Sequence, residues 1–305
     1  MKKNIFILVI LILNSCAFSQ EENSKIINKT FEVSALDKLE IENSYGEIQI
    51  ETWDKNIIEI EVQISVKDKN KKKIQARLDG ITIDFSQTNG TVFAKTKTLN
   101  SGWGKGSMEI YYKVKMPKSN RLKLKNEYGD IRLAEHTSVV EIDLDYGSIS
   151  SSFKIKNLTL KLNYGDADLQ VVENFSTNSN YSQIETQNME NATIKCDYCD
   201  LRLGYISNVA QVNMDYGKLK LMQMDHTFTS INFKGDYNDI RFELSKNIKV
   251  NYDFKGDYSS FKVPNEEVSE PGPDNNFETK LKTNYQSTSK ITIHSDYTNV
   301  KINEN

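Results

Sequence analysis

Cys196 and Cys199 form the pair whose spacing most directly suggests chemistry in this 305-residue chain. A redox C-x-x-C pair needs a helix N-terminus that lowers a thiol pKa, and no helix is expected around these residues. A zinc site would need two more ligands, and the chain has only 3 cysteines. Along an extended strand the two Cα atoms would lie roughly 10 Å apart, beyond disulfide range unless the chain turns a corner between them. The spacing therefore favours two structural thiols, with a disulfide as the alternative.

Aspartates that directly precede a tyrosine are a second set of candidates. Stacked carboxylates could bind calcium, whose ligands are oxygens. However, the calcium-binding β-roll repeat, Gly-Gly-x-Gly-x-Asp at a shorter period, is absent. Hydrogen bonding at a chain corner explains the aspartates equally well, so we expect neither a metal nor a cofactor. The set comprises Asp145, Asp197, Asp215, Asp236, Asp257 and Asp296.

A row of cations is the third candidate, because each stands four residues after a tyrosine of the same series. Such a row could bind an anionic glycan, although charged rows are often only a solvated face. Together with two tryptophans these cations form the predicted ligand or partner surface. Its members are Arg202, Lys220, Arg241, Lys262, Lys301, Trp53 and Trp103.

Catalytic patterns are missing from the sequence. His136, His226 and His294 lie far apart, and we find no Ser/His/Asp set, nucleophile elbow or phosphate-binding loop. We therefore expect a protein that is not an enzyme.

The elements that carry these candidates form a repeat centred on tyrosine. From Tyr128 to Tyr216 the successive spacings are 18, 18, 17, 17 and 18 residues, followed by two spacings of 21. A fixed period of this kind indicates a solenoid of stacked coils. The ten copies are at Tyr45, Tyr128, Tyr146, Tyr164, Tyr181, Tyr198, Tyr216, Tyr237, Tyr258 and Tyr297.

Side-chain polarity alternates around each tyrosine. The residue three positions after it is apolar in all ten copies, the next is polar, and the fifth is apolar except at Ser151 and Thr186. The residues before the tyrosine alternate in the opposite register, so a corner lies just after it, where glycine would supply a positive φ. We expect the tyrosines to be buried as a stacked ladder. The predicted fold is all-β: a parallel β-helix or β-roll with about 17–21 residues per coil.

Residues 20–120 differ in pattern and are predicted to be N-terminal strands and a cap, followed by the repeat region 121–305. The cap should contain strands at 57–66, 81–85, 91–97 and 108–116, and a short helix at 68–78 that ends near Gly80. Segment 264–280 is expected to be a mobile insertion. Because the last copy ends at Ile302, a C-terminal cap should be short or absent.

The first residues are typical of an export signal. Lys2 and Lys3 precede an apolar run, and cleavage after residue 19 would leave Gln20 first. Alternatively, Cys16 closes a segment similar to a lipobox and would carry a lipid anchor. No later run could span a membrane. Signal removal takes the formal charge from −3 to −5, which argues against nucleic-acid binding. We expect export to the periplasm, to the outer-membrane surface or beyond the cell.

Three stretches resemble the DUF4097 family of proposed adhesins. They are Tyr45-Gly46-Glu47-Ile48-Gln49-Ile50, Thr52-Trp53-Asp54-Lys55, and Val114-Lys115-Met116-Pro117 followed by Tyr128-Gly129-Asp130-Ile131. The head domains of proposed autotransporter adhesins are similar. The resemblance implies an exported β-helical protein and supplies no catalytic residues. Coils with Ser182, Cys199, Ser259 or Thr298 in place of the corner glycine should be less regular.

These observations lead to one function and two alternatives. The first is a non-enzymatic binding or structural module of the bacterial cell envelope, adhesin-like, that recognises a glycan, a surface or an envelope protein. The second is a periplasmic scaffold or sensor partner in envelope-stress regulation. The third is a polysaccharide-active enzyme, which the fold alone would not establish.

Overall fold

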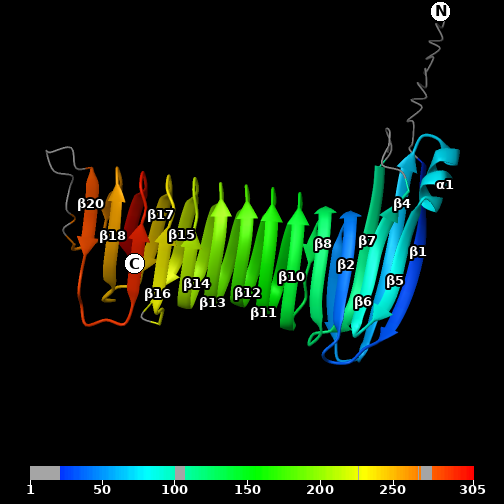
Figure 1. Ribbon diagram of the computed structural model, residues 1–305, viewed down its shortest axis with the longest axis horizontal. Coiled ribbons are helices and arrows are strands. Elements are labelled where there is room, and N and C mark those ends of the chain that lie inside the picture. The colour runs from blue at the N-terminus through cyan, green and yellow to red at the C-terminus, as the bar shows by residue number, and fades with distance from the viewer. Residues whose placement is uncertain (1–20, 100–106, 226, 267, 269–276) are drawn as a thin grey trace, which may run out of the picture.

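The computed structural model describes residues 21–99, 107–225, 227–266, 268 and 277–305. It is a long stack of β-strands, with a single helix, α1, at the N-terminal end of the described chain (Figure 1). The predicted signal with Cys16, the loop residue Trp103 and most of the predicted insertion lie outside the described residues.

The central coils are built from long parallel strands that start two residues after a tyrosine. Register is kept from coil to coil, so that Ile149 pairs with Ala167, Ala167 with Ile184, and Ile184 with Leu201. Along each strand alternate side chains are apolar and point inward. The stacked coils bring these side chains together in one hydrophobic core. These strands are β11 (Ser148–Asn163), β12 (Asp166–Asn180), β13 (Gln183–Asp197) and β14 (Asp200–Asn213).

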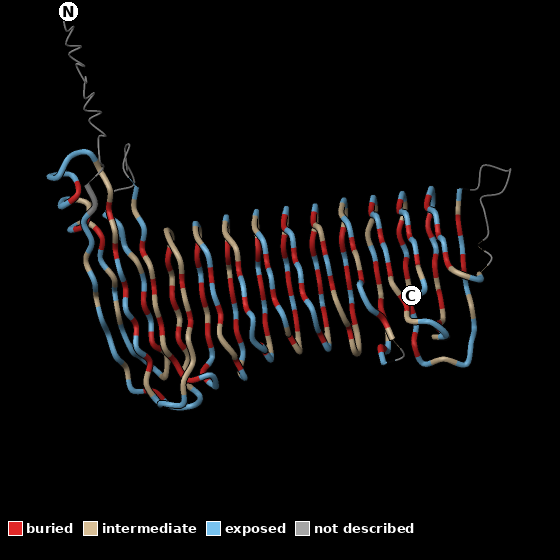
Figure 2. Tube along the Cα trace, turned by 180° about the vertical axis from the view of Figure 1, so that it is seen from behind, coloured by how far each residue is buried: buried red, intermediate tan, exposed pale blue. Residues whose placement is uncertain are grey.

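Burial follows the predicted alternation. All ten residues three positions after the tyrosines are buried, from Ile48 at 0% exposure to Phe261 at 5%. Figure 2 shows buried and exposed residues alternating along the strands of the stack. The prediction of an all-β solenoid with period-2 packing is confirmed.

The N-terminal end widens into two capping sheet extensions. One consists of β7 and β4 with β1 at its edge, and the other of β6 with β5 at its edge. They flank the first coil, and the predicted cap with one helix is confirmed. The bounds are β1 (Glu21–Glu32), β2 (Lys38–Tyr45), β3 (Ile48–Trp53), β4 (Ile57–Asp68), β5 (Ile81–Thr88), β6 (Thr91–Thr98), β7 (Ser107–Pro117), β8 (Arg121–Tyr128), β9 (Ile131–Arg132) and β10 (His136–Asp145).

Helix α1 (Lys71–Asp79) follows from local sequence signals. The Asn70 side chain accepts a hydrogen bond from the Lys72 backbone N–H, and the helix ends at Gly80. Ile74 and Leu78, one turn apart, are buried against the sheet.

The C-terminal coils do not stack in chain order, an arrangement that the sequence did not predict. Strand β21 lies between β16 and β18, and β22 lies between β17 and β19. Beyond them β20 pairs antiparallel with β18 and forms a cap (Figure 1). The bounds are β15 (Lys218–Met224), β16 (Ser230–Lys234), β17 (Asp239–Leu244), β18 (Asn251–Asp257), β19 (Ser260–Lys262), β20 (Glu278–Lys282), β21 (Lys290–His294) and β22 (Asn299–Glu304).

The tyrosines form the predicted ladder, but they are not buried. Consecutive rings stack nearly parallel, for example 4.8 Å apart between the ring centres of Tyr181 and Tyr198. From Tyr128 onward each is 47–52% exposed. We define these ten tyrosines as the tyrosine ladder.

The corner conformation also differs from the prediction. From Tyr146 onward the tyrosine itself has the positive φ, 56° in this first case, whereas only Gly46 and Gly129 carry it at the next position. A left-handed conformation costs a bulky residue about 1–2 kcal/mol. Stacking on both neighbours offsets part of that cost.

Polar residues replace glycine at the corner without making the coils irregular, contrary to the prediction. The position after the tyrosine points inward. The Ser182 hydroxyl donates to the carbonyls of Asn180 and Leu162 at 2.8 and 3.2 Å, and Ser259 likewise bonds to the carbonyl of Ser295 at 2.8 Å. These side chains satisfy carbonyl groups that the corner would leave without partners.

Candidate functional site

The five predicted cations lie side by side on five neighbouring coils. Strand pairing places Arg202 beside Lys220, Lys220 beside Arg241, Arg241 beside Lys301, and Lys301 beside Lys262. Neighbouring strands are about 4.8 Å apart, so the row spans about 19 Å along the solenoid. We call these five residues the basic column. If the coils stacked in chain order, Lys262 would lie next to Arg241. Because the last coil is inserted earlier in the stack, Lys301 lies between them.

The basic column is exposed, and its charges are not neutralised by close ion pairs with described residues, although Glu185 lies directly beside Arg202. Four of its side chains are exposed and Lys220 is half-buried. In the described part of the chain none of the five forms an ion pair within 4.0 Å. By contrast Arg132, at the same coil position nearer the N-terminus, pairs with Glu47 at 3.2 Å.

Two surface hollows flank the column. The smaller, about 200 Å³, is lined by Arg202, Lys220 and Arg241 together with Lys218, Asp200 and Asp239. The larger, about 620 Å³, lies on the other side of Arg202 and Lys220, around Gly204 and Tyr205. The cations outnumber the carboxylates in the smaller hollow by four to two, so its net charge is positive.

Trp53 does not join this surface. Trp53 belongs to the first coil, five coil steps from Arg202, which is on the order of 24 Å. Its indole N–H donates to the Ile57 carbonyl at 2.8 Å, and the Lys55 ammonium lies 4.6 Å from the ring centre. Trp103 lies outside the described residues. The site is therefore the basic column without Trp53.

Cys196 and Cys199 form a disulfide, so the prediction of two free thiols was wrong. Their Cα atoms are 6.0 Å apart. The extended-strand estimate failed because the corner at Tyr198, with φ 57°, turns the chain between them. Both sulfur-bearing side chains are inward and buried, at 0% and 2% exposure.

The stacked aspartates serve the backbone. Asp215, Asp236 and Asp296 each accept the N–H of the aspartate on the next coil, at 2.7–2.8 Å. The structural interpretation therefore accounts for one oxygen of each of these three carboxylates. In the part of the chain that the structure describes, no group of three or more His, Cys, Asp and Glu side chains suits a metal ion.

The two described histidines, His136 and His294, are not brought together. His136 is buried, and desolvation there lowers its pKa. His294 is exposed on β21, with Asp253 nearby. That carboxylate bonds to Lys290 at 2.8 Å, which lowers the pKa of Asp253. His226 is outside the described residues.

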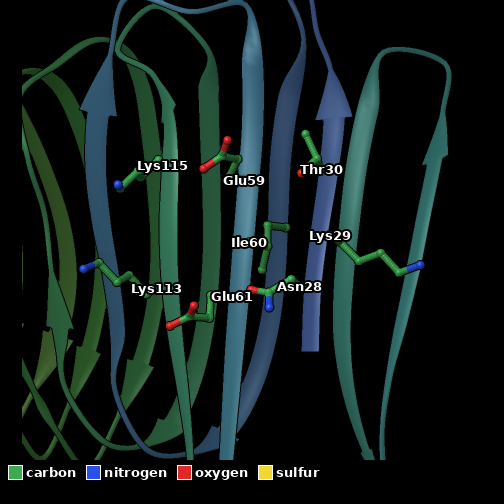
Figure 3. A pocket seen from close by; sticks show the side chains of 8 residues that line it. All are labelled: Asn28, Lys29, Thr30, Glu59, Ile60, Glu61, Lys113 and Lys115. Atoms are coloured by element: carbon green, nitrogen blue, oxygen red, sulfur yellow. The ribbon is translucent and has the colours of Figure 1, made fainter. Parts of the chain in front are cut away.

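A further hollow of about 250 Å³ lies on the N-terminal sheet across β1, β4 and β7. Opposite charges face each other there, Glu59 beside Lys115 and Glu61 beside Lys113. Figure 3 shows these four side chains on one side and Lys29 extending away from them toward the neighbouring hairpin. With Lys29 the lining carries three lysines and two glutamates, a smaller excess of cations than the four against two of the hollow at the basic column, so it offers less to a charged ligand.

A ladder of asparagine side chains was not predicted from the sequence. Amide groups link Asn157, Asn174, Asn191 and Asn208 from coil to coil, each donating to the preceding one at 2.9–3.0 Å. Their constant spacing of 17 residues was the available signal. This ladder links the return corners of four successive coils and supports their register up to the coil of Arg202.

The described residues contain no helix long and apolar enough to cross a membrane; α1 has nine residues. The comparison with curated proteins found no match.

Several solved structures are similar over most of the chain. A proposed lipid-binding protein from Parabacteroides distasonis has 12% identity and a TM-score of 0.49, covering 90% of this chain and 96% of its own. A proposed adhesin from Bacteroides fragilis has 14% identity and a TM-score of 0.40, covering 92% and 97%. A proposed cell adhesion protein from Clostridium sporogenes has 10% identity and a TM-score of 0.24, covering 93% and 100%. At these TM-scores we draw no functional argument from them.

The sequence itself gives the classification. The model of one family, Toastrack DUF4097, matches residues 36–303, which is nearly the whole described chain. That match agrees with the resemblance carried by the Tyr-Gly motifs at Tyr45 and Tyr128. The chain belongs to the Toastrack DUF4097 family.

Proposed function

We propose that this protein is an exported, non-enzymatic binding module of the bacterial cell envelope, and that its basic column binds an acidic glycan. The observation that carries the proposal is the alignment of Arg202, Lys220, Arg241, Lys301 and Lys262 on adjacent strands without ion-pair partners.

The charges of the basic column do not stabilise the fold. Like charges directly opposite each other on neighbouring strands destabilise a sheet. Two unit charges about 5 Å apart in water would repel by about 0.8 kcal/mol. The row contains four pairs of neighbouring cations on adjacent strands.

Geometry argues for a linear polymer. The charges follow the solenoid axis at a regular spacing of about 4.8 Å, so an extended polyanion could contact several of them at once. Several weak contacts along one chain add to a useful affinity, whereas a small anion would meet only one or two.

Two features support export. The N-terminal residues have the pattern of an export signal, and the buried Cys196–Cys199 disulfide suits an oxidising compartment. An envelope glycan is the acidic polymer that an exported protein of this kind would meet. Either the periplasm or the outer surface fits the proposal.

The test is direct binding of a defined acidic polysaccharide. We expect immobilised polygalacturonate, a linear polymer of a carboxylated sugar, to retain the protein at about 10 mM salt, where the Debye length is about 30 Å. Retention should fall steeply at about 1 M salt, and neutral dextran should not retain the protein. Equal retention on both polymers, or none on polygalacturonate, would contradict the proposal.

A further inference from the structure

The larger hollow beside the basic column has features that charge alone does not explain. Its volume of about 620 Å³ lies within the range of small-ligand sites. Gly204 lies at its centre, between Gln187 and Met222 on the neighbouring strands. A Cβ at this position would lie 2.2 Å from the Gln187 carbonyl oxygen. Only glycine allows this close approach of the two strands at the hollow.

One wall of the hollow is apolar and fixed in place. Met222, which is 47% exposed, lines the hollow together with Tyr205. The Tyr205 hydroxyl bonds to Asp225 at 3.0 Å and also contacts Thr227. These bonds hold the phenol ring in one orientation before any ligand arrives.

The other walls are polar. Gln187, Asn188 and Gln223 line the hollow, and their amide groups form no hydrogen bond with another described residue. Arg202 and Lys220 stand at the rim, with Glu185 beside them. The hollow thus combines an apolar wall, free amide donors and acceptors, and two cations.

We propose that the Gly204 hollow seats one carboxylated sugar residue of the bound polymer. A sugar ring has apolar C–H faces that pack on an aromatic ring, and hydroxyls that bond to amides and carboxylates. The Arg202 guanidinium matches a carboxylate with two parallel hydrogen bonds. Tyr205 and Met222 therefore pack against the face of the sugar ring. The amide groups and Glu185 form hydrogen bonds with the sugar hydroxyls, and Arg202 and Lys220 bind the carboxylate.

This inference rests on the proposed function and adds selectivity to it. The basic column alone would bind any polyanion. The Gly204 hollow distinguishes an acidic sugar from an acidic polymer that has no sugar ring, because only the sugar fills the apolar wall and the amide groups.

The experiment measures dissociation constants for trigalacturonate and for poly-L-glutamate at low salt. The variants are Tyr205→Ala and Met222→Gln, with Phe153→Ala, a 55% exposed apolar residue on a different coil, as the matched control. We expect Tyr205→Ala to weaken trigalacturonate binding about tenfold and Met222→Gln about threefold, with poly-L-glutamate binding and the control unchanged. Because Met222 is exposed, its variant keeps the test valid even if Tyr205→Ala perturbs the loop at Asp225.

Two outcomes would overturn the inference in distinguishable ways. If folded Tyr205→Ala and Met222→Gln proteins bind trigalacturonate as the parent does, the sugar seat is wrong while charge-based binding by the column stands. If the parent binds neither ligand, the proposed function fails and the sugar seat fails with it.

Discussion

Tyr237 stacks on Tyr297, sixty residues later in the chain, with ring centres 4.8 Å apart, and Tyr258 stacks on the far side of Tyr297. The last coil of the chain is therefore enclosed between two coils that precede it in sequence. The same insertion places Lys301 between Arg241 and Lys262. The C-terminal strands thus complete the proposed binding surface.

We predict slow amide hydrogen exchange in the C-terminal strands β21 and β22. Both are paired on two sides, and the Asn305 backbone N–H bonds to the Leu244 carbonyl at 2.9 Å. Hydrogen-exchange mass spectrometry should show protection comparable to β17, with faster exchange in β20, which pairs on one side. Fast exchange in β22 with protection in β19 would mean that the coils stack in chain order.

We predict opposite outcomes for two adjacent substitutions. Ile240→Asp places a charge at a position with 0% exposure and should cost more than about 4 kcal/mol of unfolding free energy, or prevent folding. Arg241→Asp should be neutral or slightly stabilising, within about 1 kcal/mol, because it relieves repulsion from Lys220 and Lys301. Urea unfolding measures both. Similar losses at the two positions would refute the assignment of inward and outward faces.

We predict that the positive φ of Tyr181 strains the corner and that ring stacking offsets this strain. Tyr181 stacks on Tyr164 and Tyr198 and has φ 52°. Tyr181→Ala should cost about 2 kcal/mol through loss of two stacked neighbours. Tyr181→Gly should cost about 1 kcal/mol less than alanine, because glycine accepts the positive φ. Tyr181→Phe should be neutral, since this hydroxyl bonds to no described residue.

Thermal and urea unfolding of the three Tyr181 variants provide the check. An alanine variant more stable than the glycine variant would show that the corner carries no left-handed strain.

His136 should make stability depend on pH. Burial lowers its pKa from the ordinary 6.5, so below that pH the unfolded chain takes up a proton that the folded chain does not. Unfolding free energy should therefore fall as the pH drops from about 7.5 toward 5, with a slope of at most about 1.4 kcal/mol per pH unit from this group. His136→Phe should remove that part of the slope. An identical pH profile for the variant would exclude His136 as its source.

The sequence predicted which residues point inward because apolar and polar residues alternate in every coil, as at Ile240, Arg241 and Phe242. It could not predict which residue adopts the corner conformation. Glycine is the usual carrier of a positive φ, whereas here stacking between neighbouring coils keeps tyrosine in that conformation. The same corner brought Cys196 and Cys199 within disulfide range, which an extended strand would not allow.

The candidate site was only partly predictable. The five cations could be named from their position after each tyrosine, but their order depends on the insertion of β21 and β22, which are separated from β17 by the β18–β20 segment. Trp53 lies five coil steps from Arg202 and contacts Ile57 and Lys55, so its part in a ligand surface stays a prediction. The Gly204 hollow depends on side chains from three strands and has no signature within any one of them.

The most direct test of the account is the dissociation constant for polygalacturonate of two charge-matched variants. One carries Arg202→Gln, Lys220→Gln and Arg241→Gln in the basic column. The other carries Lys156→Gln, Lys195→Gln and Lys234→Gln, three exposed lysines elsewhere on the solenoid that form no ion pair with described residues. We predict about tenfold weaker binding for the column variant and little change for the control. Equal weakening in both variants would mean that net charge alone drives binding, and unchanged binding in the column variant would contradict the proposed site.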